Sequence, residues 1–150
     1  MPKAPPRRTE RSLAFQVLYS QEFVSCGTLE ELEKAFALAP RQDEQAGKPA
    51  GFAWDLVRGV WENEKKLDEI ISAHSNNWRL ERVGRVELTL LRLAVYEMLY
   101  CPDVPPKVAM NEALDLNRQF GEEKSKAFVN GILDAVSKAD ENGPLSQKDR

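Results

Sequence analysis

The segment GRVELTLLRLAVYEML, residues 84–99, decides the fold of this chain. On a helical wheel its apolar side chains cover most of the circumference, and the polar strip is narrow: Arg85, Thr89 and Arg92. A helix that is apolar nearly all round packs on several sides, so this segment predicts a central helix shared by layers of other helices. Glu87 and Glu97 fall inside the apolar arc, where a carboxylate needs a polar partner, either within the fold or on another molecule.

Helical periodicity continues on both sides of this segment, and no stretch alternates convincingly as a strand would. Thr28 and Glu31 form a capping-box pattern that predicts a helix start. The stretch CPDVPP at 101–106 ends the central helix, because proline cannot extend a helix interior. We therefore expect an all-α fold of about seven helices. They are expected at 8–23, after Thr28, at 50–73, 78–83 and 84–99, from Pro105 or Pro106 to Gly121, and at 123–139.

The composition is that of a globular protein, with 42% hydrophobic and 30% charged residues in a chain of 150. We expect one helical domain over 1–139, with a basic arm at 1–11 and a disordered tail at 140–150. Cys26 and Cys101 fit neither a disulfide framework nor a zinc pattern, so we expect reduced thiols in a cytoplasmic protein. No apolar run approaches the ~20 residues that a membrane-spanning helix needs.

Charge is distributed unevenly along the chain, whose net charge is −3. The first 20 residues carry Lys3, Arg7, Arg8 and Arg11 against Glu10, which leaves +3 in this segment and −6 in the remainder. A basic tip on an acidic body predicts a directed contact with an anion. Charge alone leaves the alternative of a solvated tail open.

The arginines of the arm share a helix face with the apolar residues Ala14, Phe15 and Leu18 further along. Unpaired arginines are almost never fully buried, so we expect the first helix to overhang the body and project Arg7, Arg8 and Arg11. These arginines, with Lys3 in the same short arm, suit contacts with phosphate groups.

Lys124 and Phe128 form a second candidate surface, on the predicted last helix. They lie one turn apart, beside a stripe of apolar residues expected to be buried: Val129, Ile132, Leu133 and Val136. An aromatic ring with a neighbouring cation suits base stacking combined with a phosphate contact. The alternative is that Phe128 is the margin of the stripe and Lys124 is solvated. Gly131 is expected to permit close approach of another helix.

No group of residues in the sequence suggests catalysis. The only histidine, His74, lies near a predicted helix end without a neighbouring cysteine or paired acid. Phosphate-cradling glycine loops, zinc-ligand spacings and a serine elbow are all missing from the sequence. We therefore expect a protein that is not an enzyme and has no catalytic residue, metal site or cofactor.

Three segments, which together span most of residues 7–136, resemble the NusB transcription antitermination family. They are RRTER at 7–11 with AFQVLY at 14–19, VELTLLRLAVYE at 86–97, and VPPKVAMNEA at 104–113 with FG at 120–121 and FVNGILD at 128–134. The last is the most specific, because a proline helix start, an internal Asn-Glu pair and a downstream Phe-Val-Asn-Gly occur there in order.

The resemblance implies two packed helical bundles that bind the boxA element of ribosomal RNA leaders. The implied RNA contacts are Arg7, Arg8, Arg11 and Phe128, to which we add Lys3 and Lys124. The resemblance also implies a protein partner, the small-subunit ribosomal protein NusE, which Tyr19 and Glu87 would face, and a place in the antitermination complex of RNA polymerase. Some family members are dimeric, with the dimer covering the RNA face. The resemblance therefore leaves both a monomer and a homodimer open for this chain.

Two departures from the family pattern bear on RNA binding. Thr9 and Glu10 interrupt the arm, which is often a denser arginine run in the family, whereas Lys124 stands where the family often has an acid. We expect the arm alone to bind RNA more weakly, so that specific RNA binding also requires Lys124, Phe128 and a partner protein. The competing hypotheses are a protein-interaction module without RNA binding, and the helical domain of an RNA methyltransferase, which would require a longer chain.

Overall fold

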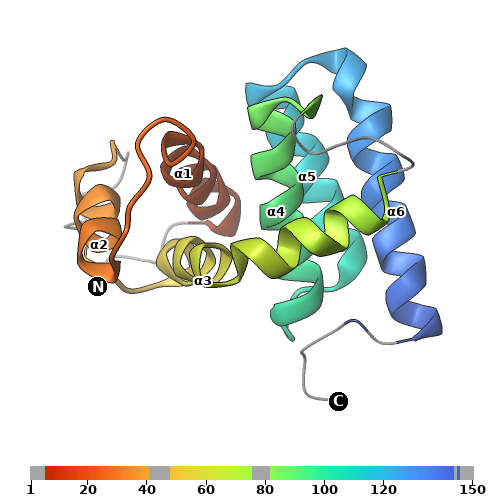
Figure 1. Cartoon of the computed structure of the whole chain (residues 1–150), viewed down its shortest axis with the longest axis horizontal. Coiled ribbons are helices and arrows are strands. Elements are labelled where there is room, and N and C mark those ends of the chain that lie inside the picture. The colour runs from red at the N-terminus through yellow and green to blue at the C-terminus, as the bar shows by residue number, and fades with distance from the viewer. Residues whose placement is uncertain (1–5, 41–47, 76–81, 144, 146–150) are drawn as a thin grey trace. The chain divides into compact units, whose positions relative to one another are not determined.

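The computed structural model describes residues 6–40, 48–75, 82–143 and 145. Within these ranges the regular structure consists of the helices α1 to α6 and the short 3-10 helix η2, so the all-α prediction is confirmed (Figure 1). The chain divides into two compact units, residues 1–62 and 63–150. Lys3 and most of the predicted helix at 78–83 lie outside the described residues.

α4 (Arg85–Tyr100) is the central helix of the second unit, as the sequence predicts. α5 (Pro106–Phe120) and α6 (Lys126–Asn142) each pack against α4 and against one another (Figure 1). The buried residues of α4 extend from Leu88 to Leu99 and lie in every direction around the helix axis. Each fully buried leucine contributes about 1.5–3 kcal/mol, so the covering of α4 is the main stabilising feature of this unit.

α1 (Arg7–Ser20), α2 (Leu29–Leu38) and the first part of α3 (Phe52–Ala73) form the first unit. Its core includes Phe36 and Trp54, whose rings meet edge to face with centroids 5.3 Å apart. Thr28 caps α2 as predicted, because its hydroxyl accepts a hydrogen bond from the Glu31 backbone N–H at 3.2 Å.

Several helix boundaries differ from the prediction. α1 ends at Ser20 and is followed by tight turns instead of continuing to residue 23. The predicted last helix is divided into η2 (Glu123–Ser125) and α6, which continues to Asn142. The first residues of the expected disordered tail are therefore helical, while 144 and 146–150 lie outside the described residues.

The polar strip of α4 is narrower than the sequence predicts. Thr89 is 2% exposed, and its hydroxyl donates to the Arg85 carbonyl at 2.7 Å. Thr89 belongs to the predicted polar strip and is nevertheless buried, because a hydroxyl that bonds to the preceding turn can be buried at little cost.

Arg92 ties α4 to the second half of α3. Its Nε and Nη2 donate to the two carboxylate oxygens of Asp68 at 2.7 and 2.9 Å, and its Nη1 lies 2.9 Å from Glu64 Oε1. The Arg92 side chain is only 12% exposed. A bidentate pair that is largely withdrawn from water fixes geometry more strongly than an exposed ion pair.

Substitution of Arg92 by methionine should lower the free energy of unfolding by about 2 kcal/mol, because Asp68 loses its bidentate partner in a half-buried position. Arg58→Met is the matched control, since Arg58 pairs with Glu62 at the surface with its side chain 50% exposed. Urea denaturation followed by circular dichroism measures both variants. Equal midpoints for the two would contradict a structural role for the Arg92 pair.

Candidate nucleic-acid interface

The basic arm enters the described structure at the start of α1. Pro6 precedes the helix in an extended conformation, and its carbonyl accepts the first helical hydrogen bond from the Glu10 N–H at 3.1 Å. Arg7 and Arg8 are exposed in the first turn, as expected. They are the arginines of the described arm that present their side chains to solvent.

Arg11 is buried, with 4% of its surface exposed. The expectation that the helix carries all three arginines clear of the body is therefore wrong for this residue. Phe52, the first residue of α3, contributes to this burial, because the Arg11 guanidinium lies over its ring with Cζ 5.2 Å from the centroid. A cation stacked on an aromatic face tolerates partial removal from water better than an isolated one.

Arg7 lies over the same ring, with its Cζ 4.3 Å from the Phe52 centroid. Arg7, Arg11 and Phe52 therefore form one group, which we name the Arg7–Phe52–Arg11 cluster. The sequence analysis did not single out Phe52. Helical periodicity identifies the two arginines as neighbours, but it carries no signal that a ring from another helix meets them.

The chain reaches Phe52 through Gly51, whose φ of +97° lies in the left-handed region that favours glycine. The Gly51 carbonyl accepts from the Asp55 N–H at 3.0 Å, which closes the first turn of α3. A Cβ at Gly51 would lie 3.5 Å from Glu10 Oε1, so the position has room for a methyl group but an unfavourable backbone conformation.

Lys124 and Phe128 lie in the second unit, at the junction of η2 and α6. The Lys124 side chain is 81% exposed and lies 3.2 Å from the Glu122 carboxylate, while Phe128 is half-buried. The stripe beside Phe128 is buried as predicted, and it consists of Val129, Ile132, Leu133 and Val136. Gly131, in contrast, is exposed with open space around it, so its predicted role in helix packing is wrong.

Asn117 holds the turn that leads to Lys124. It is 2% exposed, and its Nδ2 donates to the Glu122 carbonyl at 3.2 Å. The Gly121 N–H donates to the Asn117 carbonyl at 2.8 Å. Gly121 ends α5 as predicted, whereas the role of Asn117 was missed, because its partner lies beyond the helix end.

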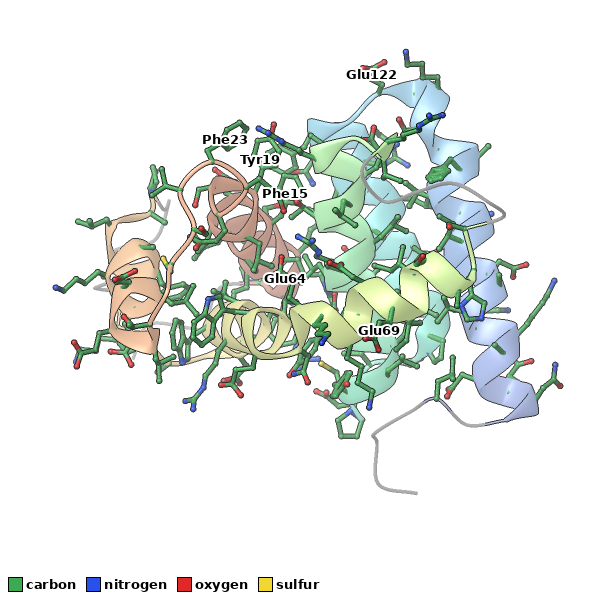
Figure 2. All side chains as sticks on the ribbon, in the orientation of Figure 1. Phe15, Tyr19, Phe23, Glu64, Glu69 and Glu122 are labelled. Carbon is green, nitrogen blue, oxygen red and sulfur yellow. The ribbon has the colours of Figure 1, made fainter. Side chains whose placement is uncertain are left out.

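Tyr19 is part of an aromatic row along α1 and the turns that follow it. Its ring stacks on buried Phe15 with centroids 5.7 Å apart and meets Phe23 edge to face at 5.3 Å. Phe23 and its neighbour Val24 are 59% and 76% exposed. Figure 2 shows the three labelled rings following one another from Phe15 outward to Phe23. The row ends in exposed apolar surface, which is the kind of surface that protein partners contact.

Glu87 is half-buried in the first turn of α4 and accepts a hydrogen bond from the Ser125 hydroxyl at 2.6 Å. The sequence predicted that a carboxylate at this position needs a partner, and Ser125 of η2 supplies one within the fold. The bond holds one carboxylate oxygen in place beside η2, which carries Lys124.

No helix within the described ranges has the length and apolar character needed to cross a membrane. No group of three or more His, Cys, Asp or Glu side chains in these parts of the chain is placed to hold a metal ion.

The model of the NusB family matches residues 8–138. A "Transcription antitermination protein NusB" of Desulfovibrio desulfuricans is 58% identical over 147 residues, covering 94% of this chain and 90% of the relative. One of Myxococcus xanthus is 44% identical and covers 89% of this chain and 95% of the relative.

Solved structures give the same result. The NusB structure from T. maritima is 36% identical, with a TM-score of 0.75 over 91% of this chain and 93% of that one. A structure of the antitermination factors NusB and NusE in complex with dsRNA contains a chain 28% identical to this one. Its TM-score is 0.73, and the match covers 89% of this chain and 96% of that one.

Replacement of Gly51 by alanine should lower the free energy of unfolding by about 1 kcal/mol, because a side chain strains a residue with positive φ. Gly131→Ala is the matched control, since it adds a methyl group to an open helical position and should be neutral or stabilising by up to about 1 kcal/mol. Urea denaturation measures both. If Gly51→Ala proves as stable as Gly131→Ala, the left-handed turn before Phe52 is not a requirement of the fold.

Proposed function

Because the chain belongs to the NusB family, we propose that it is an RNA-binding transcription antitermination factor. It binds a boxA-type ribosomal RNA leader sequence together with the ribosomal protein NusE and promotes processive transcription by RNA polymerase. The observation that carries the proposal is its similarity to a NusB chain solved with NusE and dsRNA. The protein acts in the cytoplasm by binding and performs no catalysis.

The RNA contacts of this proposal lie in both units, and each unit supplies its own set. In the first unit, Arg7 and Arg8 present guanidinium groups that suit phosphate oxygens, and Arg11 supports Arg7 through the shared ring. Lys3 belongs to the same arm. In the second unit, the exposed ammonium of Lys124 serves phosphate, and the half-buried ring of Phe128 serves a base.

Lys124 is available to RNA although it pairs with Glu122. Both side chains of this pair are largely exposed, at 81% and 66%, and an exposed ion pair contributes about 0–1 kcal/mol. A phosphate group can therefore replace the Glu122 carboxylate at small cost.

NusE, the protein partner, contacts Tyr19 in the first unit and Glu87 in the second. The exposed end of the aromatic row supports the first contact, because it supplies apolar surface next to a tyrosine. The Ser125 hydrogen bond supports the second, because it holds the Glu87 carboxylate in one position for a basic residue of the partner.

The function is tested by titrating a boxA-type RNA oligonucleotide with the protein, alone and with saturating NusE. We expect NusE to tighten RNA binding by more than tenfold, since the two ligands share one complex and weak contacts add through effective concentration. Glu87→Gln, which keeps an acceptor for Ser125 and removes the charge, should reduce this gain.

The matched control is Glu30→Gln, an exposed acid on α2, which should leave the gain unchanged. RNA affinity that does not respond to NusE would exclude the adaptor mechanism. Absence of any RNA binding at physiological salt would favour a protein-interaction module instead.

The arm is tested by the double variant Arg7→Ala with Arg8→Ala. Loss of two phosphate contacts should make the plot of log K against log salt shallower by about 1.4, because each neutralised phosphate of single-stranded RNA contributes about 0.7 to the slope. The control is Lys34→Ala with Lys66→Ala, which removes the same charge from exposed positions on α2 and α3. If both double variants make the plot shallower to the same extent, net charge, and not the arm, determines the salt dependence of RNA binding.

A further inference from the structure

We propose that Phe52 is a positioning residue for RNA binding, whose ring holds the Arg7 guanidinium ready for a phosphate group before RNA arrives. The inference rests on the proposed function, and it assigns a role to a residue that lies outside the arm itself. The Arg7–Phe52–Arg11 cluster carries it, because one ring lies under two guanidinium groups at 4.3 and 5.2 Å.

The two arginines differ in exposure, and this difference assigns them different roles. Arg11 is 4% exposed and closes the inner side of the cluster, whereas Arg7 lies in the exposed first turn of α1. Residues four apart on a helix share a face, so both side chains reach the same ring without distortion. Arg7 is therefore the member of the cluster that a nucleic acid can reach.

Phe52 is anchored on its own side by the chain that follows it. Ala53 and Trp54 are 2% and 5% exposed, and the Trp54 ring packs against Phe36 in the core of the first unit. The turn at Gly51 fixes the point where the chain enters α3. The ring thus belongs to the folded body, and an arginine held over it is tied to that body.

Electrostatic attraction to the aromatic face holds the Arg7 cation at the ring and does not itself use an N–H donor. A guanidinium carries its N–H donors in a planar fork that matches the oxygens of a phosphate group. An arginine is normally a flexible side chain that loses rotamer freedom when it binds a ligand. An arginine held over a ring has lost part of that freedom on folding, so less affinity is lost on RNA binding.

The test compares Phe52→Leu with Phe52→Tyr in titrations of a boxA-type RNA oligonucleotide at several salt concentrations. Phe52→Leu keeps an apolar side chain but removes the aromatic face, and we expect affinity to fall by about three- to tenfold. The salt slope should stay unchanged, since the number of cations is the same. Phe52→Tyr retains the aromatic face and should bind RNA like the unsubstituted protein.

A double-mutant cycle separates positioning from a general structural role. In the background of Arg7→Ala, Phe52→Leu should lose most of its effect, because the side chain that the ring positions is missing. Equal effects of Phe52→Leu in the two backgrounds would overturn the proposal. If Phe52→Leu lowers thermal stability severely, Phe52→Met serves as the second non-aromatic variant with the same expectations.

A measurement without RNA completes the test. The side-chain proton resonances of Arg7 should show ring-current shifts in the free protein and in Phe52→Tyr, and should lose them in Phe52→Leu. Ring-current shifts that are missing from the free protein would overturn the proposal. Failure of the proposed function gives a different result, in which Arg7→Ala with Arg8→Ala leaves RNA affinity unchanged while the ring-current shifts of the unsubstituted protein remain.

Discussion

The second unit depends on one constraint, which is that α4 carries apolar side chains in nearly every direction and must be covered on all sides by its own chain. α5 and α6 supply two of the covering surfaces. Burial of apolar area has no direction, so it does not by itself set how far along α4 another helix lies. The bidentate pair of Arg92 with Asp68 supplies that direction for the second half of α3, because both of its hydrogen bonds form only at one relative position.

The sequence predicted the features whose causes are local. The wheel of α4, the proline stretch at 101–106 and the Thr28 cap each depend on residues within one or two turns, and all three are present in the structure. The burial of Arg11 and the partner of Glu87 were not predictable in the same way. Phe52 and Ser125 come from other helices, and periodicity within one helix does not reveal which side chain a second helix brings to it.

Each of the two units contributes its own modest candidate contacts. Lys124 is engaged in an exposed pair, Phe128 is only half-buried, and the described arm offers two exposed arginines. None of these is strong on its own, because exposed charges are screened by water and salt. Specific binding by such a protein requires several contacts made together, with a partner protein that adds its own, which agrees with an adaptor that assembles a complex.

Arg7 and Arg11 are four residues apart on α1, and this spacing brings both guanidinium groups over the ring of Phe52. Two arginines four apart on a helix repel each other by about 0.2–0.5 kcal/mol, whereas a cation over an aromatic face gains about 0.5–2 kcal/mol. The ring therefore more than offsets the repulsion between Arg7 and Arg11. Of the two residues that interrupt the arm, Thr9 points to the opposite face of α1. Glu10 lies beside the cluster, because its Oε1 would be 3.5 Å from a Cβ at Gly51. The interruption leaves the Arg7–Phe52–Arg11 cluster intact. The affinity of the arm for RNA therefore depends on which arginines contact the ring as well as on how many arginines the arm contains.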